Sequence, residues 1–305
     1  QLSALIAQFP PCVIGMEACS GAHYWARVFQ RCGHTAKLMA PKLVAPYRMS
    51  GKRGKNDAAD AAAICEAVTR PSMRFVPLKD EHQQATLCLH RTRQGFVEER
   101  TATYNRLRGL LSEFGVVLPQ SPERLRLDIT THMDLLPGWA QRCISDLLEH
   151  AGNIEDRLGE YDRAIAEIAR EDERSKRLMQ LRGIGPTTAS ALLASIGAGH
   201  DFRNGRQVAA WLGLTPGQHS SGGKARLGSI TKAGDAYLRS LLVLGARAVM
   251  ANLGDKQDRF SRWIRNLMER RGYWRAAVAI AAKNARMAWA VLKYGDDFRH
   301  GPVAT

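Results

Sequence analysis

The stretch "CVIGMEACSGAHYWARVFQRCGHTAKLMA" (residues 12–40) decides the fold of the N-terminal part of the chain. Its first seven residues are a short apolar run typical of a buried strand, "GAHYWARVFQRCG" predicts a helix that ends at Gly33, and "HTAKLMA" predicts a second strand. A strand, a helix and a strand in succession indicate a βαβ unit and an α/β domain. The preceding "QLSALIAQF" predicts a helix, and because the chain opens inside this pattern without a Met, we expect further residues before Gln1.

Two long amphipathic helices are predicted after this domain. They run from about residue 80 to 118 and from about residue 139 to 169, on either side of the proline-marked break "LPQSPERL". Such a pair is typical of an antiparallel hairpin or a dimerising arm. The section from about residue 175 onward is helical with glycine punctuation. We therefore expect three domains, at residues 1–78, 79–174 and 175–305.

The charge of the chain favours a polyanionic partner. The 305 residues hold 44 lysines and arginines against 29 acidic residues, a net charge of +15, and nucleic acid is the usual partner of such a protein. Residues 201–305 alone hold 18 basic and 7 acidic residues. A solvated basic surface kept for solubility is the plainer explanation, but the asymmetry along the chain favours nucleic-acid contact.

Composition also excludes several classes of protein. No run approaches the roughly 18 apolar residues of a membrane span, and no signal-peptide pattern is present, so we expect a cytoplasmic, nucleoid-associated protein without a membrane partner. The six cysteines show no C-x-x-C spacing, which argues against a zinc site or a disulfide framework. We expect them to be reduced core residues.

The segment "GKRGKNDAADAAAIC" (residues 51–65) contains two carboxylates at the head of a predicted helix. Helix capping explains Asp57 or Asp60 taken singly. Residues three apart, however, lie on one face of a helix and can hold a hard cation together, and Glu17 ends the first predicted strand, where α/β sheets place their sites. Three converging carboxylates suit Mg²⁺ ions acting on a phosphodiester. The preceding cations would hold a polyanion beside the metal; they are Lys52, Arg53 and Lys55.

A second motif is "LRGIGPTTASALLASIG" (residues 181–197). Its G-I-G turn leads into a helix that begins near Pro186, as in the helix-hairpin-helix motif that grips nucleic-acid backbones without reading sequence. Gly183, Gly185 and Thr187 would then face a phosphate. The alternative is a glycine turn between two packed helices.

The third motif is the loop inside "AAWLGLTPGQHSSGGKARLGSITKAG" (residues 209–234), which is rich in glycine and serine and carries His219, Lys224, Arg226 and Lys232. Taken alone it is typical of a flexible surface loop. A serine nucleophile needs activation and nearby positive charge, and this loop offers candidates for both. The absence of a G-x-S-x-G elbow argues against a Ser–His hydrolase.

Aromatic residues stand among arginines near the end of the chain. Trp263, Tyr273 and Trp274 could stack on bases or pack on the apolar faces of amphipathic helices. We expect packing for the aromatics and phosphate contact for the neighbouring arginines.

Taken together, "GMEACSGAHYW", "NDAADAAAIC" and the second and third motifs resemble the DEDD transposases of the IS110 family of insertion sequences, the bridge-RNA-guided recombinases. The likeness keeps the order of the motifs and covers nearly the whole chain. It implies a RuvC-like (RNase H fold) N-terminal domain, here lacking its first strands, a coiled-coil arm, and a mostly α-helical C-terminal domain that contains the helix-hairpin-helix-like motif and a catalytic serine.

The resemblance also assigns residues. Glu17 matches the glutamate of the tetrad, and Asp57 and Asp60 match its last two aspartates, while the first aspartate has no match in this sequence. The nucleophile falls after "GLTP", where alignment on "SG" selects Ser221, with Ser220 as the less favoured neighbour. The implied mechanism is a phosphoserine intermediate assisted by Mg²⁺-binding carboxylates. The implied partners are target and donor DNA, a structured guide RNA, and further copies of the chain in a dimer or tetramer.

Two other functions agree with some of these residues. A metal-dependent junction nuclease would use the carboxylates with water as the nucleophile. A non-catalytic nucleic-acid-binding protein would use only the basic final third, with the aspartates as helix caps.

Overall fold

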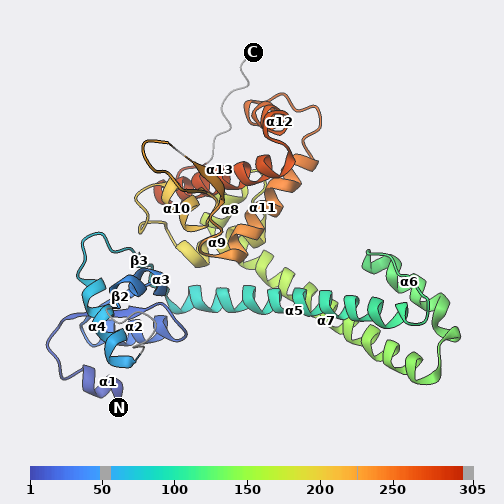
Figure 1. The fold of residues 1–305 in the computed structure, drawn as a ribbon, viewed down its shortest axis with the longest axis horizontal. Helices are drawn as coiled ribbons and strands as arrows, with labels where there is room; N and C mark the ends of the chain where they lie inside the picture. Colours follow the sequence, from blue (N-terminus) through green and yellow to red (C-terminus); the bar gives the residue numbers. More distant parts are fainter. Residues whose placement is uncertain (49–55, 225, 298–305) are drawn as a thin grey trace. The chain divides into compact units, whose positions relative to one another are not determined.

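A computed structural model describes residues 1–48, 56–224 and 226–297 and is drawn in Figure 1. The described chain is mostly helical with few strands. It divides into two compact units, Gln1–Gln84 and Ala85–Thr305; the expected domain boundaries after residues 78 and 174 stay a prediction. The three cations of the basic run, Lys52, Arg53 and Lys55, lie outside the described residues.

The N-terminal unit contains the predicted βαβ arrangement. Its elements are α1 (Leu2–Ile6), β1 (Val13–Glu17), α2 (Ala22–Arg31), β2 (Thr35–Met39), α3 (Pro41–Val44), η1 (Ala45–Tyr47), α4 (Asp57–Val68) and β3 (Phe75–Val76). Strands β1 and β2 are parallel, with Val13 opposite Thr35 and Glu17 opposite Met39, and β3 pairs antiparallel with β2. The expectation of a buried first strand is wrong, because β1 is an outer strand of the three that the structure describes in this sheet and its Val13 is exposed.

The two predicted long helices are α5 (Glu81–Ser112) and α7 (Gly138–Glu171). Their cross-contacts run in opposite directions along the chain: Tyr104 Oη donates to Glu155 Oε1 at 2.8 Å, and Arg93 Nε lies 2.5 Å from Asp162 Oδ1. The antiparallel hairpin is thus confirmed. Its far end has a core of its own, made by Tyr104, Leu107, Leu111, Val116, Leu125, Ile129, Leu136, Ile144 and Ala151.

The break between the long helices is partly helical, contrary to expectation. Helix α6 (Pro122–His132) and the 3₁₀ turn η2 (Met133–Leu135) lie between them. Pro122 takes the first helical position, where its missing N–H is not needed and its fixed φ suits the helix. The proline therefore starts a helix at this point, and Leu125 and Ile129 of that helix fill the core at the end of the arm.

The C-terminal helices share one large core. They are α8 (Glu173–Met179), α9 (Pro186–Ile196), α10 (Gly205–Trp211), α11 (Ala236–Ala251), α12 (Arg259–Arg271) and α13 (Tyr273–Tyr294). Helix α13 packs against α10, α11 and α12, and α9 packs against α7 and α8. Small residues line the contact, since Ala276, Ala277, Ala281, Ala285 and Ala288 of α13 are all fully buried.

A buried polar cluster joins the base of the arm to these helices. His90 of α5 is fully buried, and its Nδ1 lies 3.0 Å from Tyr237 Oη of α11, while its Nε2 lies 3.1 Å from Ser190 Oγ of α9. Burial first, and the charge of Arg93 second, lower the pKa of His90 to about 4. The imidazole is therefore neutral at pH 7 and acts as a hydrogen-bonding link in the core.

The glycine- and serine-rich segment folds as a β-hairpin, which the sequence did not predict. Strands β4 (Pro216–Gln218) and β5 (Leu227–Ile230) pair antiparallel.

The cysteines also differ from expectation. All six are free, but five are exposed and Cys32 is half-buried, so they are not core residues. Within the described residues, no helix is both long enough and apolar enough to cross a membrane.

Candidate active site

Glu17 and Asp60 are brought together by the close approach of α4 to β1. Glu17 ends the strand, as predicted, and Asp60 lies in the first turn of the helix. Gly15, two residues before Glu17, makes this approach possible, because a Cβ there would lie only 3.0 Å from the Cβ of Val68 and 3.2 Å from a methyl carbon of Ile64. A strand position without a side chain thus places the helix start beside the strand end.

Arg48 bridges the two carboxylates. Its Nη2 lies 3.4 Å from Glu17 Oε1 and its Nε lies 2.7 Å from Asp60 Oδ1. The three side chains are mostly buried, with exposed fractions between 22% and 26%. One guanidinium therefore balances two carboxylates at this corner, which shows that the site attracts positive charge. Sequence reasoning missed Arg48, because its place in the sequence, next to the basic run, gives no sign that it pairs with Glu17.

The donor set fits a hard divalent cation in part. Among the residues that the structure describes, no group of three or more His, Cys, Asp or Glu side chains is close enough to hold a metal ion. The structure joins Glu17 to Asp60 through Arg48, whereas Asp57 is exposed and does not complete a trio with them. Converging carboxylate oxygens are nevertheless the ligands that Mg²⁺ prefers, so Glu17 and Asp60 suit such an ion.

Helix capping does not require the two aspartates. Asn56 is the N-cap of α4, and its Oδ1 accepts a hydrogen bond from the Ala59 N–H at 2.8 Å. Asp57 and Asp60 follow in the first turn, where the helix dipole favours negative charge. Because Asn56 already supplies the cap, the carboxylate of Asp60 is available to Arg48, and that of Asp57 stays exposed.

Ser221 stands at the tip of the β4–β5 hairpin. It is followed by Gly222 and Gly223, whose φ angles of 57° and 76° are the positive values that a type I′ turn requires at both central positions. The turn is closed by the Lys224 N–H, which donates to the Ser221 carbonyl at 3.1 Å. The Ser221 side chain is exposed, and within the described residues its hydroxyl has no hydrogen-bond partner.

Ser220 has a different environment, although it is the adjacent residue. Its Oγ accepts from the Arg226 backbone N–H at 3.2 Å and from Gln218 Nε2 at 2.8 Å. The Ser220 hydroxyl thus helps to hold the two strands of the hairpin together. Lys224 and Arg226, the predicted phosphate ligands of this loop, are both exposed on the same hairpin.

The base of the hairpin is fixed by tight backbone contacts. Gly213 has φ of 69°, and a Cβ there would lie 2.4 Å from the backbone N of Ala233. A Cβ on Gly234 would lie 1.9 Å from the Trp211 carbonyl oxygen. Between them Lys232 adopts φ of 52°, a conformation that costs a non-glycine residue about 1–2 kcal/mol, while its N–H donates to the Gly213 carbonyl at 3.1 Å.

The G-I-G turn before α9 combines the two roles considered for it. Gly183 has φ of 88° and packs against α11, because a Cβ there would lie 2.8 Å from the Gly245 carbonyl oxygen. Gly185 is the exposed N-cap of α9, and a Cβ there would meet no atom of the described residues within 4 Å. Packing therefore accounts for Gly183. The start of α9, with Gly185 exposed and Thr187 half-buried, stays open for the predicted phosphate contact.

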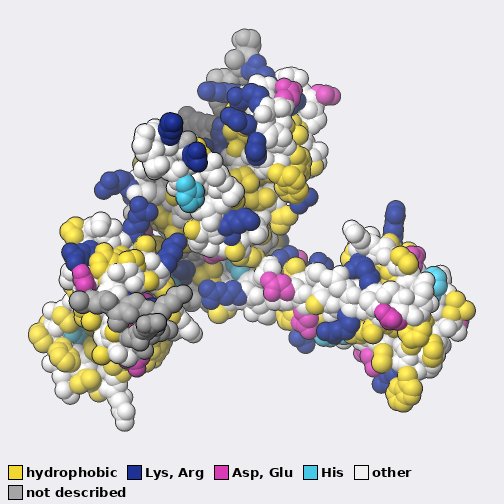
Figure 2. Space-filling view, in the orientation of Figure 1, with side chains coloured by type: hydrophobic (Ala, Val, Ile, Leu, Met, Phe, Trp, Pro, Cys, Tyr) yellow, Lys and Arg dark blue, Asp and Glu magenta, His cyan; other side chains and the backbone are white. Residues whose placement is uncertain are grey.

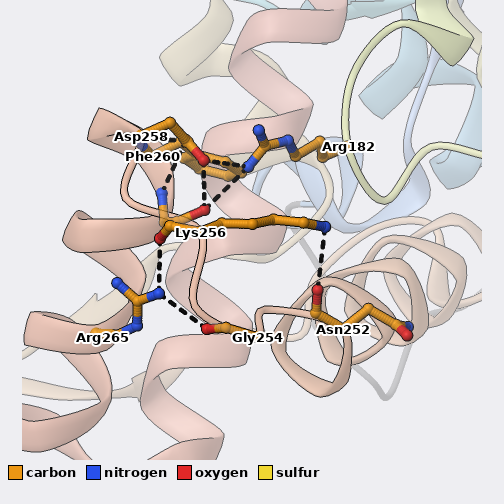
Figure 3. A network of polar contacts seen from close by, with 8 residues as sticks. Arg182, Asn252, Gly254, Lys256, Asp258, Phe260 and Arg265 are labelled. Atoms are coloured by element: carbon orange, nitrogen blue, oxygen red, sulfur yellow. Dashed lines mark hydrogen bonds and ion pairs between the residues drawn. The ribbon is translucent and has the colours of Figure 1, made fainter. Parts of the chain in front are cut away.

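Arg182 ties this turn to the start of α12 (Figure 3). Its Nη1 donates to Asp258 Oδ2 at 2.9 Å and to Ser261 Oγ at 3.0 Å. Asp258 also caps α12, accepting from the backbone N–H groups of Phe260 and Ser261. Partial burial favours the neutral acid, but the hydrogen bonds from Ser261 and Arg182 outweigh it and hold the pKa of Asp258 well below its usual range. Sequence reasoning missed this pair, whose partners are 76 residues apart.

The loop between α11 and α12 is held by further polar contacts (Figure 3). Arg265 donates to the carbonyl oxygens of Gly254 and Lys256, and Lys256 Nζ donates to the Asn252 carbonyl oxygen. A cavity of about 280 Å³ lies between this loop and the G-I-G turn. It is lined by Arg182, Gly183, Ala248, Val249, Asn252, Leu253, Lys256 and Ser261.

Comparison with protein families finds two matches, one in each half of the chain. Residues 175–262 match the family described as "Transposase IS116/IS110/IS902 family". Residues 1–116 match the DEDD transposase family of IS110, described as "Transposase". The first match contains the G-I-G turn and the hairpin of Ser221, and the second contains Glu17, Asp57 and Asp60.

Individual relatives are similar over nearly the whole chain. A "Probable family 20 transposase" of Pseudomonas aeruginosa is 46% identical over 99% of this chain and 90% of its own length. The "Transposase for insertion sequence element IS1328" of Yersinia enterocolitica is 39% identical over 98% of this chain and 89% of its own length. The "Transposase for insertion sequence element IS1111A" of Coxiella burnetii is 40% identical over 95% of this chain and 80% of its own length.

Proposed function

The chain belongs to the IS116/IS110/IS902 family of insertion-sequence transposases, and from this premise we propose that it exchanges DNA strands through a phosphoserine intermediate under the direction of a structured guide RNA. In this proposal the N-terminal unit is a RuvC-like domain, which the parallel β1–α2–β2 unit supports. The β4–β5 hairpin of the C-terminal unit carries the nucleophile, Ser221. Target and donor DNA are the substrates.

The observation that supports Ser221 as the nucleophile is the contrast with Ser220. A nucleophilic hydroxyl needs to reach a phosphorus atom, and the Ser221 hydroxyl is exposed at the tip of a turn without a hydrogen-bond partner among the described residues. The Ser220 hydroxyl already accepts two hydrogen bonds inside the hairpin. Lys224, at the other end of the same turn, supplies positive charge next to the serine, as a transition-state phosphate requires.

The proposed chemistry conserves the number of phosphodiester bonds. Ser221 Oγ loses its proton and bonds to the phosphorus, the bond from phosphorus to one strand breaks, and the departing strand oxygen takes up a proton and becomes a hydroxyl. In the second half, the hydroxyl of the partner strand attacks the phosphoserine, and Ser221 regains its proton. Because no water enters, the bond energy is kept and the strands are rejoined in a new combination.

Glu17, Asp57 and Asp60 are the residues proposed to assist the serine. They would hold a divalent cation such as Mg²⁺, which when bound supplies Lewis-acid stabilisation of the attacking and departing oxygens. Negative carboxylates also suit the activation of a hydroxyl. The bridging position of Arg48 between Glu17 and Asp60 supports this assignment, because it shows two of the three carboxylates converging on one positive group.

Nucleic acid is proposed to contact basic residues of both units. The candidates are the run of Lys52, Arg53 and Lys55, the start of α9 at Gly185 and Thr187 beside Gly183, and the hairpin residues Lys224, Arg226 and Lys232. Phosphate contacts of this kind fix the position of a duplex without reading its sequence. Base pairing with the guide RNA would supply the sequence specificity.

We also propose that the protein works as a dimer or tetramer joined through the arm. The end of the arm exposes a set of large apolar side chains that a monomer would leave in water, and Figure 2 shows apolar surface there. The most exposed are Val117 (90%), Trp139 (85%), Leu135 (77%) and Leu127 (69%). Exposed apolar patches of this kind mark interaction sites.

Covalent trapping tests the nucleophile. Wild-type protein incubated with a cognate DNA substrate and denatured should give a protein–DNA adduct that survives electrophoresis. Ser221→Ala should give none, whereas the matched control Ser220→Ala should still give one, because only its hairpin contacts are lost. An adduct from Ser221→Ala would show that the assignment is wrong.

The same assay separates the two other functions. A junction nuclease that uses water would still cut DNA as Ser221→Ala and would stop as Asp57→Asn. A protein that only binds nucleic acid would be unaffected by Asp60→Asn apart from a small loss of stability. The proposed recombinase requires each of these three substitutions, and Glu17→Gln, to abolish strand exchange while DNA binding is kept.

A further inference from the structure

Trp274 is exposed although packing was expected for it. It is the second residue of α13, and 64% of its surface is accessible, whereas Trp289 of the same helix is buried with 7% accessible. Trp263 does pack as expected, stacked on Phe260 with ring centroids 5.7 Å apart. An indole left in water is unfavourable by the hydrophobic effect, so its exposure calls for a ligand or a partner.

The surroundings of Trp274 hold the ring in place without covering it. The guanidinium carbon of Arg247, on α11, lies 5.3 Å from the ring centroid in a cation–π contact. The Tyr273 ring stands edge-on, with centroids 5.3 Å apart and an interplanar angle of 90°. Two fixed neighbours and a helical backbone give the indole a defined orientation, while most of its surface stays accessible.

Positive charge surrounds this aromatic pair. Arg270, Arg271 and Arg275 lie within four residues of Trp274 and are exposed, as is Arg247. Within the described residues none of these four arginines takes part in an ion pair, so their charges are not balanced by acidic side chains. Lysine and arginine side chains are prominent on the C-terminal helices in the view of Figure 2.

We propose that Trp274 is a stacking platform for an unpaired base of RNA, with Arg247 and the arginines of the α12–α13 turn holding the adjacent phosphates. An exposed indole offers a face that every nucleobase can stack on, and arginines contact the backbone of the same strand. Duplex DNA keeps its bases paired and stacked inside the helix, whereas a folded RNA presents unpaired loop bases to aromatic side chains. The identification of the bound strand as RNA rests on the proposed function. The exposed Trp274 ring and the arginines around it are features of the structure and do not depend on that proposal.

Binding of short probes to the full-length protein tests the platform. The probes are a fluorescent 12-nucleotide oligoadenylate RNA, the matching deoxyadenylate, and a 20-base-pair DNA duplex. Trp274→Ala should weaken binding of the RNA by about fivefold to 150-fold, the usual range for the loss of one stacked base. Binding of the duplex should change less than twofold. Trp274→Phe keeps an aromatic face and should recover most of the affinity for RNA.

A matched control is Tyr294→Ala, which removes an equally exposed aromatic ring (65%) at the other end of α13. It should leave the affinity for the RNA probe unchanged. Three results would overturn the proposal: unchanged RNA binding by Trp274→Ala, a larger loss for the deoxyadenylate than for the RNA, or an altered sedimentation coefficient with RNA binding intact, which would indicate a protein interface. Since binding is measured without strand exchange, failure of the phosphoserine mechanism would leave this result standing.

Discussion

At the scale of single residues, Arg48 decides how the paired carboxylates behave without a metal ion. Replacing it as Arg48→Met leaves Glu17 and Asp60 facing each other with no cation between them. We expect the free energy of unfolding to fall by roughly 1 kcal/mol in the presence of EDTA. Millimolar Mg²⁺ should then stabilise the variant more than the wild type, because an ion that binds only the folded state adds to its stability.

The control for this prediction is Arg70→Met. Arg70 forms an exposed ion pair with Glu66 on the same helix, α4. Its loss should not change the response to Mg²⁺, which thermal unfolding with and without EDTA would measure. Equal Mg²⁺ responses for both variants and the wild type would contradict a cation site at Glu17 and Asp60.

His90 makes the stability of the folded chain depend on pH. Its folded pKa of about 4 lies below the ordinary value of 6.5, so on acidification the unfolded state takes up the proton first. The contribution of this residue is therefore complete above about pH 6.5 and is lost as the pH falls toward 4, by up to about 3 kcal/mol. The charge of Arg93 acts on this pKa, and Asp162 pairs with Arg93.

Chemical denaturation at pH 7 and pH 4.5 measures this dependence. His90→Gln should lower the stability at pH 7 and lose less on acidification than the wild type, since no imidazole is left to protonate. His219→Gln, at an exposed position of the hairpin, should follow the wild-type curve. The same pH dependence in wild type and His90→Gln would mean that other groups cause it.

The sequence predicts the positions of the site residues better than their partners. Glu17 at a strand end and Asp60 in a first helical turn follow from periodicity and capping patterns, which are local. The bridge through Arg48 depends on how closely α4 approaches β1, and that is set by the missing side chain at Gly15. The choice between Ser220 and Ser221 likewise needed the hairpin. Its hydrogen bonds engage the Ser220 hydroxyl, whereas the Ser221 hydroxyl has no partner in the part of the chain that the structure describes.

At the scale of elements, the contact between the G-I-G turn and α11 is the tightest test of the fold. Gly245→Ala places a Cβ 1.9 Å from the Gly183 carbonyl oxygen, and backbone on both sides leaves little room to adjust. We expect a loss of at least about 1–3 kcal/mol in the free energy of unfolding. Because the turn precedes α9, duplex DNA binding should weaken as well if this helix start contacts phosphate.

The matched control is Gly159→Ala on the exposed side of α7, where a Cβ has no neighbour within 4 Å among the residues that the structure describes. An alanine there should stabilise the helix by about 0.5–1 kcal/mol, since it only removes the backbone freedom of glycine in the unfolded chain. Urea denaturation measures both variants. Equal effects of the two substitutions would argue against the close packing of Gly183 on Gly245.

Elements with a regular apolar pattern were predictable, whereas helix α6 and the β4–β5 hairpin were not. Helices α5 and α7 and the β1–α2–β2 unit carry their pattern over many residues, so the sequence predicts them. Helix α6 is short and opens at Pro122, which also signals a break. The strands of the β4–β5 hairpin contain residues of low strand propensity, Pro216, Gly217 and Gly228. The sequence signal for the hairpin is the Gly222–Gly223 pair, but a glycine pair is equally typical of a flexible loop.

At the scale of the whole molecule, the net charge varies along the chain, and each of the two units has an apolar core of its own. Residues 1–79 hold 11 basic and 4 acidic residues, residues 80–200 hold 15 and 18, and residues 201–305 hold 18 and 7. The stretch that contains the arm is thus slightly acidic and the two ends are basic. The two units have separate apolar cores, with Met39 and Ala63 in one and Leu178 and Leu192 in the other. Nucleic-acid contact is therefore expected from both ends, and folding from each unit by itself.

Expression of residues 80–305 alone tests both expectations. This fragment keeps all of α5 together with Asp80, whose Oδ1 accepts from the Gln83 N–H at its start. It should unfold cooperatively, because the cores of the arm and of the C-terminal helices lie entirely within it.

The same fragment should bind duplex DNA with a shallower dependence of log affinity on log salt concentration than the full chain. If all three cations at residues 52, 53 and 55 contact phosphates, their loss accounts for a change in slope of about 3, because each phosphate contact contributes roughly 0.9. Full-length protein with these three residues changed to alanine is the control and should show the same decrease in slope; a fragment whose slope equals that of the wild type would place all phosphate contacts in the second unit.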